Sequence, residues 1–297
     1  MKDLEGNIIL ITGATDGLGE KVATDFAALG ATLLLHGRDP EKGRRVTAAI
    51  SETTGSDRLH YYNADLASLA AVEALADSIA ADWRGLDVLV NNAGVGAGPD
   101  PKRRELSRDG FELRFAVNYL APFLLSYRLL PLLRLRADEV GLARIVNVAS
   151  VAQQALDFED VMLEKGYDGM RAYAQSKLAL IMFSFDLAHE LVGTGITVNA
   201  MHPASLMDTK MVREWFGAAR TTVEEGARYL ERLAVDDEVQ GKTGLYFDQG
   251  TPARAAEQAY DEKARERLRE LSLKLISLRQ GYGRHVGGIN PDDESRR

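Results

Sequence analysis

The 297-residue sequence contains no cysteine, which excludes disulfide bonds, thiolate metal sites and a cysteine nucleophile. Its five histidines are scattered and lack the spacing of metal ligands, so we expect no bound metal. The chain does not begin with a charged segment followed by a short apolar run, and no apolar run comes near the ~18 residues needed to span a membrane. These features predict a cytoplasmic protein without a membrane span.

Positive charge is in deficit, because 36 lysines and arginines face 44 aspartates and glutamates, for a formal net charge of −8. Such a chain does not present a broad basic face to a phosphate backbone, so we expect no nucleic-acid partner. The content of 45% hydrophobic and 27% charged residues is typical of a globular protein. A chain of this length can also bury a sizeable core.

Short aliphatic runs alternate along the chain with longer segments of helical periodicity. We expect strands at 8–12, 31–36, 59–62, 86–91, 143–150, 195–202 and 243–247. We expect helices at 17–29, 40–54, 68–83, 106–136, 171–192 and 221–234. Apolar runs with few charges are typical of parallel strands buried on both faces. The pattern predicts a Rossmann-type, doubly wound α/β fold with a mainly seven-stranded parallel sheet and helices on both faces.

No repeat, linker or shift in composition divides the chain, so we expect one dinucleotide-binding and catalytic domain over residues 1–281. Thr251 as N-cap and Pro252 in the first turn predict a C-terminal helix over 252–280, which Gly281 would end. Residues 282–297 are polar and rich in glycine, and we expect this tail to be disordered.

A glycine-rich turn follows the first expected strand and leads into a helix. Gly13, Gly17 and Gly19 allow the backbone to bend sharply and to approach a ligand closely. The N-terminus of the next helix offers free N–H groups to a phosphate. The spacing differs from the G-x-G-x-x-G fingerprint, and a tight strand–helix turn without a ligand is the alternative. The Gly-Lys-Thr at 241–243 has Asp236 where a triphosphate-binding loop needs its first glycine.

The end of the second expected strand indicates which dinucleotide binds. Asp39 and Pro40 are interpreted as the N-cap and first residue of a helix, so the carboxylate is not free to hold the ribose hydroxyls of NAD. Arg38 can pair with a 2′-phosphate through its planar guanidinium group. We therefore expect NADP(H) rather than NAD; a solvated surface arginine is the alternative interpretation.

Further motifs occur in the order and spacing of one family. Residues 12–19 resemble a TGxxxGxG turn, residues 91–94 an NNAG motif, and Tyr173 with Lys177 a YxxxK motif. From about Gly6 to Leu278 the chain resembles the short-chain dehydrogenase/reductase family, in its shorter-chain branch. In residues 37–43 and 115–125 the sequence resembles that of retinol-dehydrogenase-like members of the family.

Two positions depart from the family pattern. Ala204 replaces the glycine usual after Pro203, and the gap between Ser150 and Tyr173 is long, which suggests an insertion over 151–170 beside the substrate. Neither departure removes a reacting group.

The resemblance implies both a cofactor site and a catalytic site. The implied cofactor contacts are Gly13, Thr15, Asp16, Gly17, Leu18, Gly19, Arg38, Asp65, Leu66, Asn92, Ala93, Gly94, Tyr173, Lys177, Pro203 and Thr209. The implied catalytic residues are Asn118, Ser150, Tyr173 and Lys177. By resemblance, Lys177 also binds the nicotinamide ribose, Ser150 holds the substrate oxygen, and Asn118 carries a water link to Lys177.

Tyr173 and Lys177 are four residues apart and so share one face of a helix. A free tyrosine has a pKa of ~10, and a neighbouring ammonium lowers it towards the value that a general acid/base needs. We therefore predict an oxidoreductase that moves a hydride between nicotinamide and a carbonyl or alcohol carbon, with Tyr173 as acid/base. The alternatives are a non-catalytic NADP-binding regulator on the same fold, or a biosynthetic-pathway ketoreductase with the same site.

Two apolar segments bear on substrate and assembly. Residues 204–220 contain Leu206, Met207, Met211, Val212, Trp215 and Phe216, which form either a lid over a lipophilic substrate or ordinary helix packing. Residues 178–185 are apolar on nearly every face. By resemblance, one face of this helix would meet a partner subunit, so we expect a homo-oligomer, dimer or tetramer.

Overall fold

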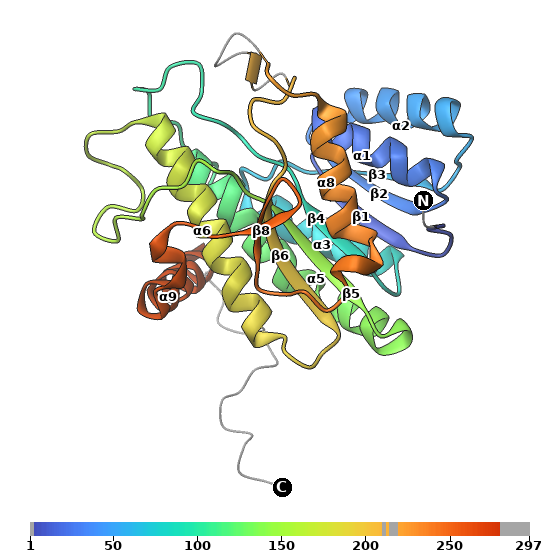
Figure 1. Ribbon diagram of the computed structural model, residues 1–297. Helices are drawn as coiled ribbons and strands as arrows, with labels where there is room; N and C mark the ends of the chain where they lie inside the picture. The colour runs from blue at the N-terminus through green and yellow to red at the C-terminus, as the bar shows by residue number, and fades with distance from the viewer. Residues whose placement is uncertain (1–2, 210–211, 214–218, 280–297) are drawn as a thin grey trace, which may run out of the picture.

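The computed structural model describes residues 3–209, 212–213 and 219–279. Eight strands form one sheet in the order β3-β2-β1-β4-β5-β6-β7-β8 (Figure 1). The strands are β1 Ile8–Thr12, β2 Thr32–Gly37, β3 Leu59–Asn63, β4 Val88–Asn91, β5 Ala143–Val148, β6 Ile196–His202, β7 Tyr246–Asp248 and β8 Thr251–Ala253. The first seven pair in parallel, as predicted, and β8 adds an antiparallel edge strand.

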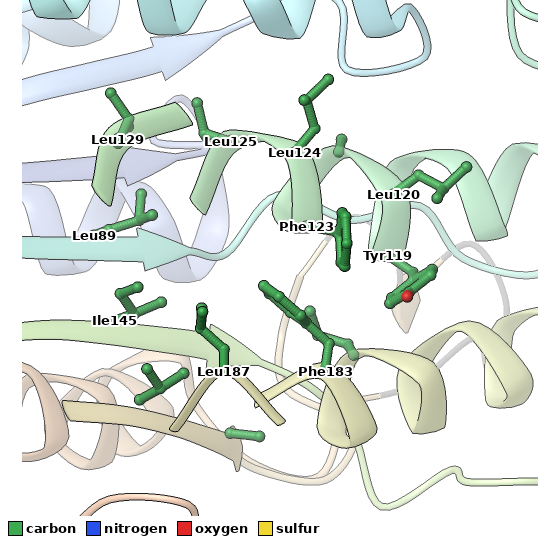
Figure 2. Close-up of a cluster of buried hydrophobic side chains, with 14 of the residues drawn as sticks. Leu89, Tyr119, Leu120, Phe123, Leu124, Leu125, Leu129, Ile145, Phe183 and Leu187 are labelled. Atoms are coloured by element: carbon green, nitrogen blue, oxygen red, sulfur yellow. The ribbon is translucent and has the colours of Figure 1, made fainter. Parts of the chain in front are cut away.

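Helices cover both faces of this sheet, which confirms the predicted doubly wound fold. The helices are α1 Gly17–Ala28, α2 Pro40–Thr54, α3 Leu69–Asp82, α4 Leu113–Phe115, α5 Ala121–Val140, α6 Gly169–Glu190, α8 Val223–Val235 and α9 Glu262–Arg279. Successive side chains of a strand point to opposite faces. Ile9 and Ile11 therefore pack against α1, α2 and α8, whereas Leu10 packs in a core shared with α3, α5 and α6. In Figure 2, Leu89 and Ile145 of the sheet meet Leu125 of α5 and Leu187 of α6.

The predicted start of α2 is confirmed. Pro40 is its first residue, and the Asp39 carboxylate accepts hydrogen bonds from the backbone N–H groups of Glu41 and Lys42 at 2.9 and 3.1 Å. Asp168 caps α6 in the same way, with bonds from Met170 and Arg171. Helix α6 therefore begins at Gly169, two residues earlier than predicted.

The helix predicted over 106–136 begins later and ends later. Leu106 pairs with Glu112 in an isolated bridge around Gly110, whose φ is +83°. The Glu112 carboxylate then accepts a hydrogen bond from the Phe115 backbone N–H, which starts α4. A π-helical turn, η1 Ala116–Leu120, joins α4 to α5, which ends at Val140. The turn residues at 109–110 separate Leu106 from the helical repeat.

The combined helical stretch Leu113–Val140 is long and apolar enough to cross a membrane by length and composition alone. The expectation that no run approaches this length is therefore wrong. Of the 18 residues that make this stretch long and apolar enough, 83% are buried inside the protein. Its apolar character is explained by packing between α3, α6 and the sheet.

The C-terminal helix begins ten residues later than predicted, because 251–253 form β8. Gln249 and Gly250 have φ values of +48° and +79°, so the chain reverses in a two-residue hairpin of the primed type. Pro252 is tolerated because β8 is an edge strand. After a 3₁₀ turn, η3 Glu257–Tyr260, the true N-cap is Asp261, whose carboxylate accepts from the N–H groups of Lys263 and Ala264.

Helix α9 covers the outer side of α6. The buried hydroxyls of Tyr119 and Ser272 are 2.5 Å apart, and Arg265 Nε donates to Asp186 Oδ1 at 2.6 Å. The chain's own C-terminal helix thus packs against α6, the helix that the resemblance implies for a partner contact. Of the predicted lid, residues 210–211 and 214–218 lie outside the described residues, as do Gly281 and the tail 282–297.

Candidate active site

The glycine turn after β1 is packed closely against the loop after β4. Gly13 and Gly17 have φ values of +67° and +51°, the left-handed region that favours glycine. A Cβ on Gly13 would lie 2.9 Å from Ala93 Cα, and one on Gly19 would lie 2.2 Å from the Gly13 carbonyl oxygen. The turn therefore needs glycines for its shape, and the shape leaves backbone N–H groups at the N-terminus of α1.

Thr12 and Asn92 hold this turn in place. Thr12 Oγ1 accepts hydrogen bonds from the backbone N–H groups of Asn92 and Ala93, both at 3.0 Å. Asn92 Nδ2 donates to the carbonyl oxygens of Thr12 at 2.9 Å and Gly13 at 3.2 Å. Asn92 and Ala93, named as cofactor contacts from the sequence, thus lie directly beside the glycine turn and fix its backbone.

His36 joins the same turn to β2 and β3. Its Nδ1 accepts from the Gly13 backbone N–H at 3.3 Å, and its Nε2 donates to the Ala64 carbonyl at 3.0 Å. Burial lowers the pKa of His36 to about 4, so the ring is neutral and can donate and accept at the same time. Nothing near His36 in the sequence indicates these contacts with residues 13 and 64, so the sequence alone does not assign His36 a place at the site.

Arg38 follows β2 at the same edge of the sheet. Its side chain is exposed and makes no hydrogen bond or ion pair within the described residues. A Cβ on Gly37 would lie 2.7 Å from Thr15 Cγ2, so Thr15 closes over the end of β2. Lys42 Nζ lies 2.5 Å from Asp16 Oδ2, which joins α2 to the glycine turn.

The other predicted cofactor contacts lie around this edge. Asp65 accepts from the Ala67 backbone N–H at 3.0 Å and forms an ion pair with Arg108. A Cβ on Gly17 would lie 3.2 Å from Thr209 Cγ2, so Thr209 lies over the turn. The side chains of Leu18 and Leu66 are buried in the two cores, so a ligand would meet their backbone, and Pro203 directly follows β6.

The catalytic candidates come from β5 and α6. Lys177 is buried, and its Nζ donates to the Val148 carbonyl at the end of β5, at 2.7 Å. The same Nζ lies 5.8 Å from the centroid of the Tyr173 ring. Burial lowers the pKa of Lys177 to about 8, because the ammonium loses its solvation.

Tyr173 is hydrogen-bonded to Ser150, across the 22 intervening residues. Burial raises the pKa of Tyr173, and the Ser150 hydrogen bond opposes that rise without reversing it. The predicted net lowering of the Tyr173 pKa is therefore wrong, because loss of solvation sets the direction. A phenol with a raised pKa is protonated at neutral pH.

Asn118 lies in the π-helical turn η1 and joins the loop after β4 to α6. Its Oδ1 accepts from the Val95 backbone N–H at 2.8 Å, and its Nδ2 donates to the Val95 carbonyl and to Ser176 Oγ, both at 2.9 Å. Ser176 Oγ in turn donates to the Tyr173 carbonyl at 2.7 Å. A Cβ on Gly94 would lie 3.3 Å from Asn118 Oδ1 and 3.5 Å from Lys177 Nζ, so Gly94 separates these two side chains. Such π-turns are frequent at functional sites.

The catalytic candidates therefore converge at the carboxyl edge of the sheet, beside the glycine turn. Ligands of open α/β sheets bind at that edge. Among the described residues, no group of three or more histidines and carboxylates could hold a metal ion.

Comparison with known proteins agrees with this arrangement. Residues 7–219 match the short chain dehydrogenase family. The chain is 34% identical to mouse retinol dehydrogenase 13, over 94% of this chain and 86% of that protein, and 35% identical to mouse polyprenol dehydrogenase, over 93% and 85%. A putative Escherichia coli short chain dehydrogenase solved with NADPH superposes with a TM-score of 0.68 at 30% identity, covering 84% of this chain and 99% of that one. An uncharacterised Mycobacterium paratuberculosis protein superposes with a TM-score of 0.76 at 27% identity, covering 93% and 96%. The chain therefore belongs to the short-chain dehydrogenase family and is an oxidoreductase of that family.

Proposed function

We propose that this protein is an NADP(H)-dependent oxidoreductase that transfers a hydride between nicotinamide and a carbonyl or alcohol carbon, with Tyr173 as general acid/base. One observation carries the proposal. The hydrogen-bonded pair of Ser150 and Tyr173 lies with Lys177 at the edge of the sheet where the glycine turn opens.

The chain's own residues fit a phosphorylated dinucleotide. The turn at Gly13, Gly17 and Gly19 would hold the pyrophosphate on backbone N–H groups, since a side chain at Gly19 would overlap the turn itself. Arg38 is exposed and has no carboxylate partner among the residues that the structure describes, whereas Asp39 caps α2. Relatives solved with NADPH or NADP, from Escherichia coli and Shigella flexneri, support the same choice. A bound nicotinamide would supply the hydride in reduction and accept it in oxidation.

Tyr173 would donate its proton to the substrate oxygen in reduction. Because burial raises its pKa, the phenol is protonated at neutral pH and carries the proton that reduction requires. The Ser150 hydroxyl, already bonded to the phenol, would orient the same oxygen. The Lys177 ammonium would stabilise the phenolate left behind, because an opposite charge nearby favours the ionised form. Asn118, through Ser176, holds α6 and hence Tyr173 against the loop after β4.

The substrate side favours a lipophilic alcohol or ketone. Val151 and Met170 are 48% and 39% exposed although they are apolar, and they lie next to Ser150 and near Tyr173 in the chain. Exposed apolar side chains at a site provide contacts for an apolar ligand. Relatives named for retinol and polyprenol support this substrate class.

A homo-oligomer and a cytoplasmic location remain predictions. Because α9 covers the outer side of α6, an assembly of this chain would use another surface unless α9 were displaced.

The decisive experiment is a panel of ketones, aldehydes and alcohols assayed with NADPH or NADP⁺ by the absorbance of reduced nicotinamide. We expect the Tyr173→Phe variant to lose turnover on any active substrate and to retain NADPH binding. The matched control is Tyr62→Phe, in the edge strand β3, whose hydroxyl donates to Asp82 at the end of α3; it should keep wild-type turnover. Full turnover by Tyr173→Phe would refute the acid/base role, and tighter binding of NADH than NADPH would refute the cofactor assignment.

A further inference from the structure

The backbone carbonyl of Ser150 is held by two side chains. Ser150 lies two residues past the end of β5, so the sheet ladder does not satisfy this carbonyl. Instead, Tyr246 of β7 donates its hydroxyl to the carbonyl oxygen at 3.2 Å, and Gln153 Nε2 donates to it at 3.0 Å. Ser150 and Tyr246 are 7% and 3% exposed, so these bonds are shielded from water.

Gln153 also connects Ser150 to the C-terminal part of the chain. Its Oε1 accepts from the Ala256 backbone N–H, just after β8, at 2.7 Å. The Gln153 side chain is also hydrogen-bonded to Tyr246. Burial raises the pKa of Tyr246, so its hydroxyl keeps its proton and remains a donor. Both ends of the Gln153 amide are thereby used, one on Ser150 and one on the segment that follows the β7–β8 hairpin.

The next residues of the segment between Ser150 and Tyr173 are held by η3 and α6. Gln258 of η3 accepts from the Leu156 N–H at 2.7 Å and donates to the Leu156 carbonyl at 3.1 Å. Gln175 of α6 donates to the Ala155 carbonyl at 2.7 Å. The start of the long segment between Ser150 and Tyr173 is therefore fixed by amide side chains from η3 and α6.

Fixing the Ser150 carbonyl also fixes its hydroxyl. Ser150 Oγ accepts from the Ala152 backbone N–H at 3.1 Å, in a tight turn, and is bonded to Tyr173. If the carbonyl were released, the backbone at 149–152 could rotate and the hydroxyl would move relative to Tyr173. A misplacement of ~1 Å at a reacting centre can reduce the rate roughly 100-fold.

We propose that Tyr246 and Gln153 are positioning residues for Ser150, and that the segment from β7 to η3 thereby forms part of the catalytic apparatus. This inference rests on the proposed function, in which Ser150 orients the substrate oxygen.

The test compares Tyr246→Phe, Gln153→Leu and Gln153→Glu with the matched neighbour Gln154→Leu, whose side chain is exposed and makes no hydrogen bond among the described residues. We measure kcat and KM for carbonyl reduction, NADPH affinity by nicotinamide fluorescence, and Tm. We expect kcat to fall about 3- to 10-fold in Tyr246→Phe and at least about 10-fold in Gln153→Leu. NADPH affinity should stay within about twofold of wild type, and Gln154→Leu should match wild type throughout.

Gln153→Glu adds a readout that a general loss of stability would not give. A carboxylate cannot donate to the Ser150 carbonyl, whereas a protonated carboxyl group can. The kcat of this variant relative to wild type should therefore rise as the pH falls from 8 towards 5.5.

The outcomes separate this inference from the proposed function. If the wild type reduces no carbonyl in the panel, the proposed function fails, and this inference fails with it. If the wild type is active and the Tyr246 and Gln153 variants retain its kcat, only this inference fails. If kcat falls only in variants whose NADPH affinity and Tm also fall, this inference is likewise overturned.

Discussion

Replacing Lys177 with methionine should make the protein more stable and inactive. Lys177 is 5% exposed, and among the described residues its ammonium donates one hydrogen bond, to the Val148 carbonyl. Its pKa falls from 10.5 to about 8 because of burial. The folded protein thus holds this charge at neutral pH against a cost that the unfolded chain does not bear.

The size of the effect follows from that pKa. The fall of the Lys177 pKa from 10.5 to about 8 corresponds to about 3 kcal/mol of destabilisation at pH 7. Methionine keeps most of the apolar stem but loses the hydrogen bond to Val148, which offsets about 1 kcal/mol. The net gain is about 2 kcal/mol, or a few degrees in Tm for a chain of this size. Turnover should fall to background, because the phenolate of Tyr173 loses its cation.

The pH dependence identifies the cause. Between pH 8 and 10.5 the folded protein binds fewer protons than the unfolded chain at Lys177, so wild-type stability gains from rising pH over this window. The advantage of Lys177→Met should therefore shrink by about 2 kcal/mol between pH 7 and 9.5. Urea unfolding at both pH values measures this, with the exposed Lys274→Met as control. A variant less stable than wild type at pH 7, or an advantage independent of pH, would refute the reasoning.

Three further predictions concern the cofactor turn and a carboxyl pair. Gly19→Ala should weaken NADPH binding at least tenfold and lower the free energy of unfolding by about 1–3 kcal/mol, because its Cβ would lie 2.2 Å from the Gly13 carbonyl oxygen. Fluorescence titration measures the binding and thermal unfolding the stability, and wild-type values in both would contradict the close packing. Arg38→Ala should weaken NADPH binding by about tenfold or more and leave NADH binding unchanged, since it removes a charge-assisted pair worth about 1.5–3 kcal/mol; equal losses for both would contradict it. Burial and the hydrogen bond to Asp25 raise the pKa of Glu231 to about 8 from 4.5, so its contribution to stability is complete below pH 4.5 and is lost as the pH rises through 8. Glu231→Gln should abolish this loss of stability, which is about 1 kcal/mol between pH 5 and 9 after allowance for solvent screening. If wild type and variant show the same dependence of stability on pH in urea unfolding, this prediction is wrong.

The parts of this protein that depend on local chemistry were predictable from the sequence. The alternation of apolar runs and helical segments predicts the parallel sheet, and Asp39 with Pro40 predicts the start of α2. The glycine spacing at 13, 17 and 19 predicts the turn, and the Tyr173–Lys177 spacing places both residues on α6. Each of these follows from interactions within about one helical turn or one strand–helix unit.

The predictions that failed depended on contacts distant in sequence. Whether 251–253 form a helix or a strand was decided by pairing with β7, because an edge ladder satisfies more backbone groups there than an isolated first turn of helix. The apolar stretch from Leu113 to Val140 has the composition of a membrane span, and its burial between α3, α6 and the sheet is a tertiary property.

The chemistry of the site divides in the same way. The sequence by itself determined which reacting groups are present and that Tyr173 and Lys177 share a helix face. Only the tertiary structure decided that Ser150 meets Tyr173 across the 22 intervening residues, that His36 supports the glycine turn, and that Tyr246 reaches the Ser150 carbonyl. It also decided the direction in which the Tyr173 pKa moves, because loss of solvation depends on everything packed around the phenol, whereas residue spacing specifies only its nearest neighbours on the helix.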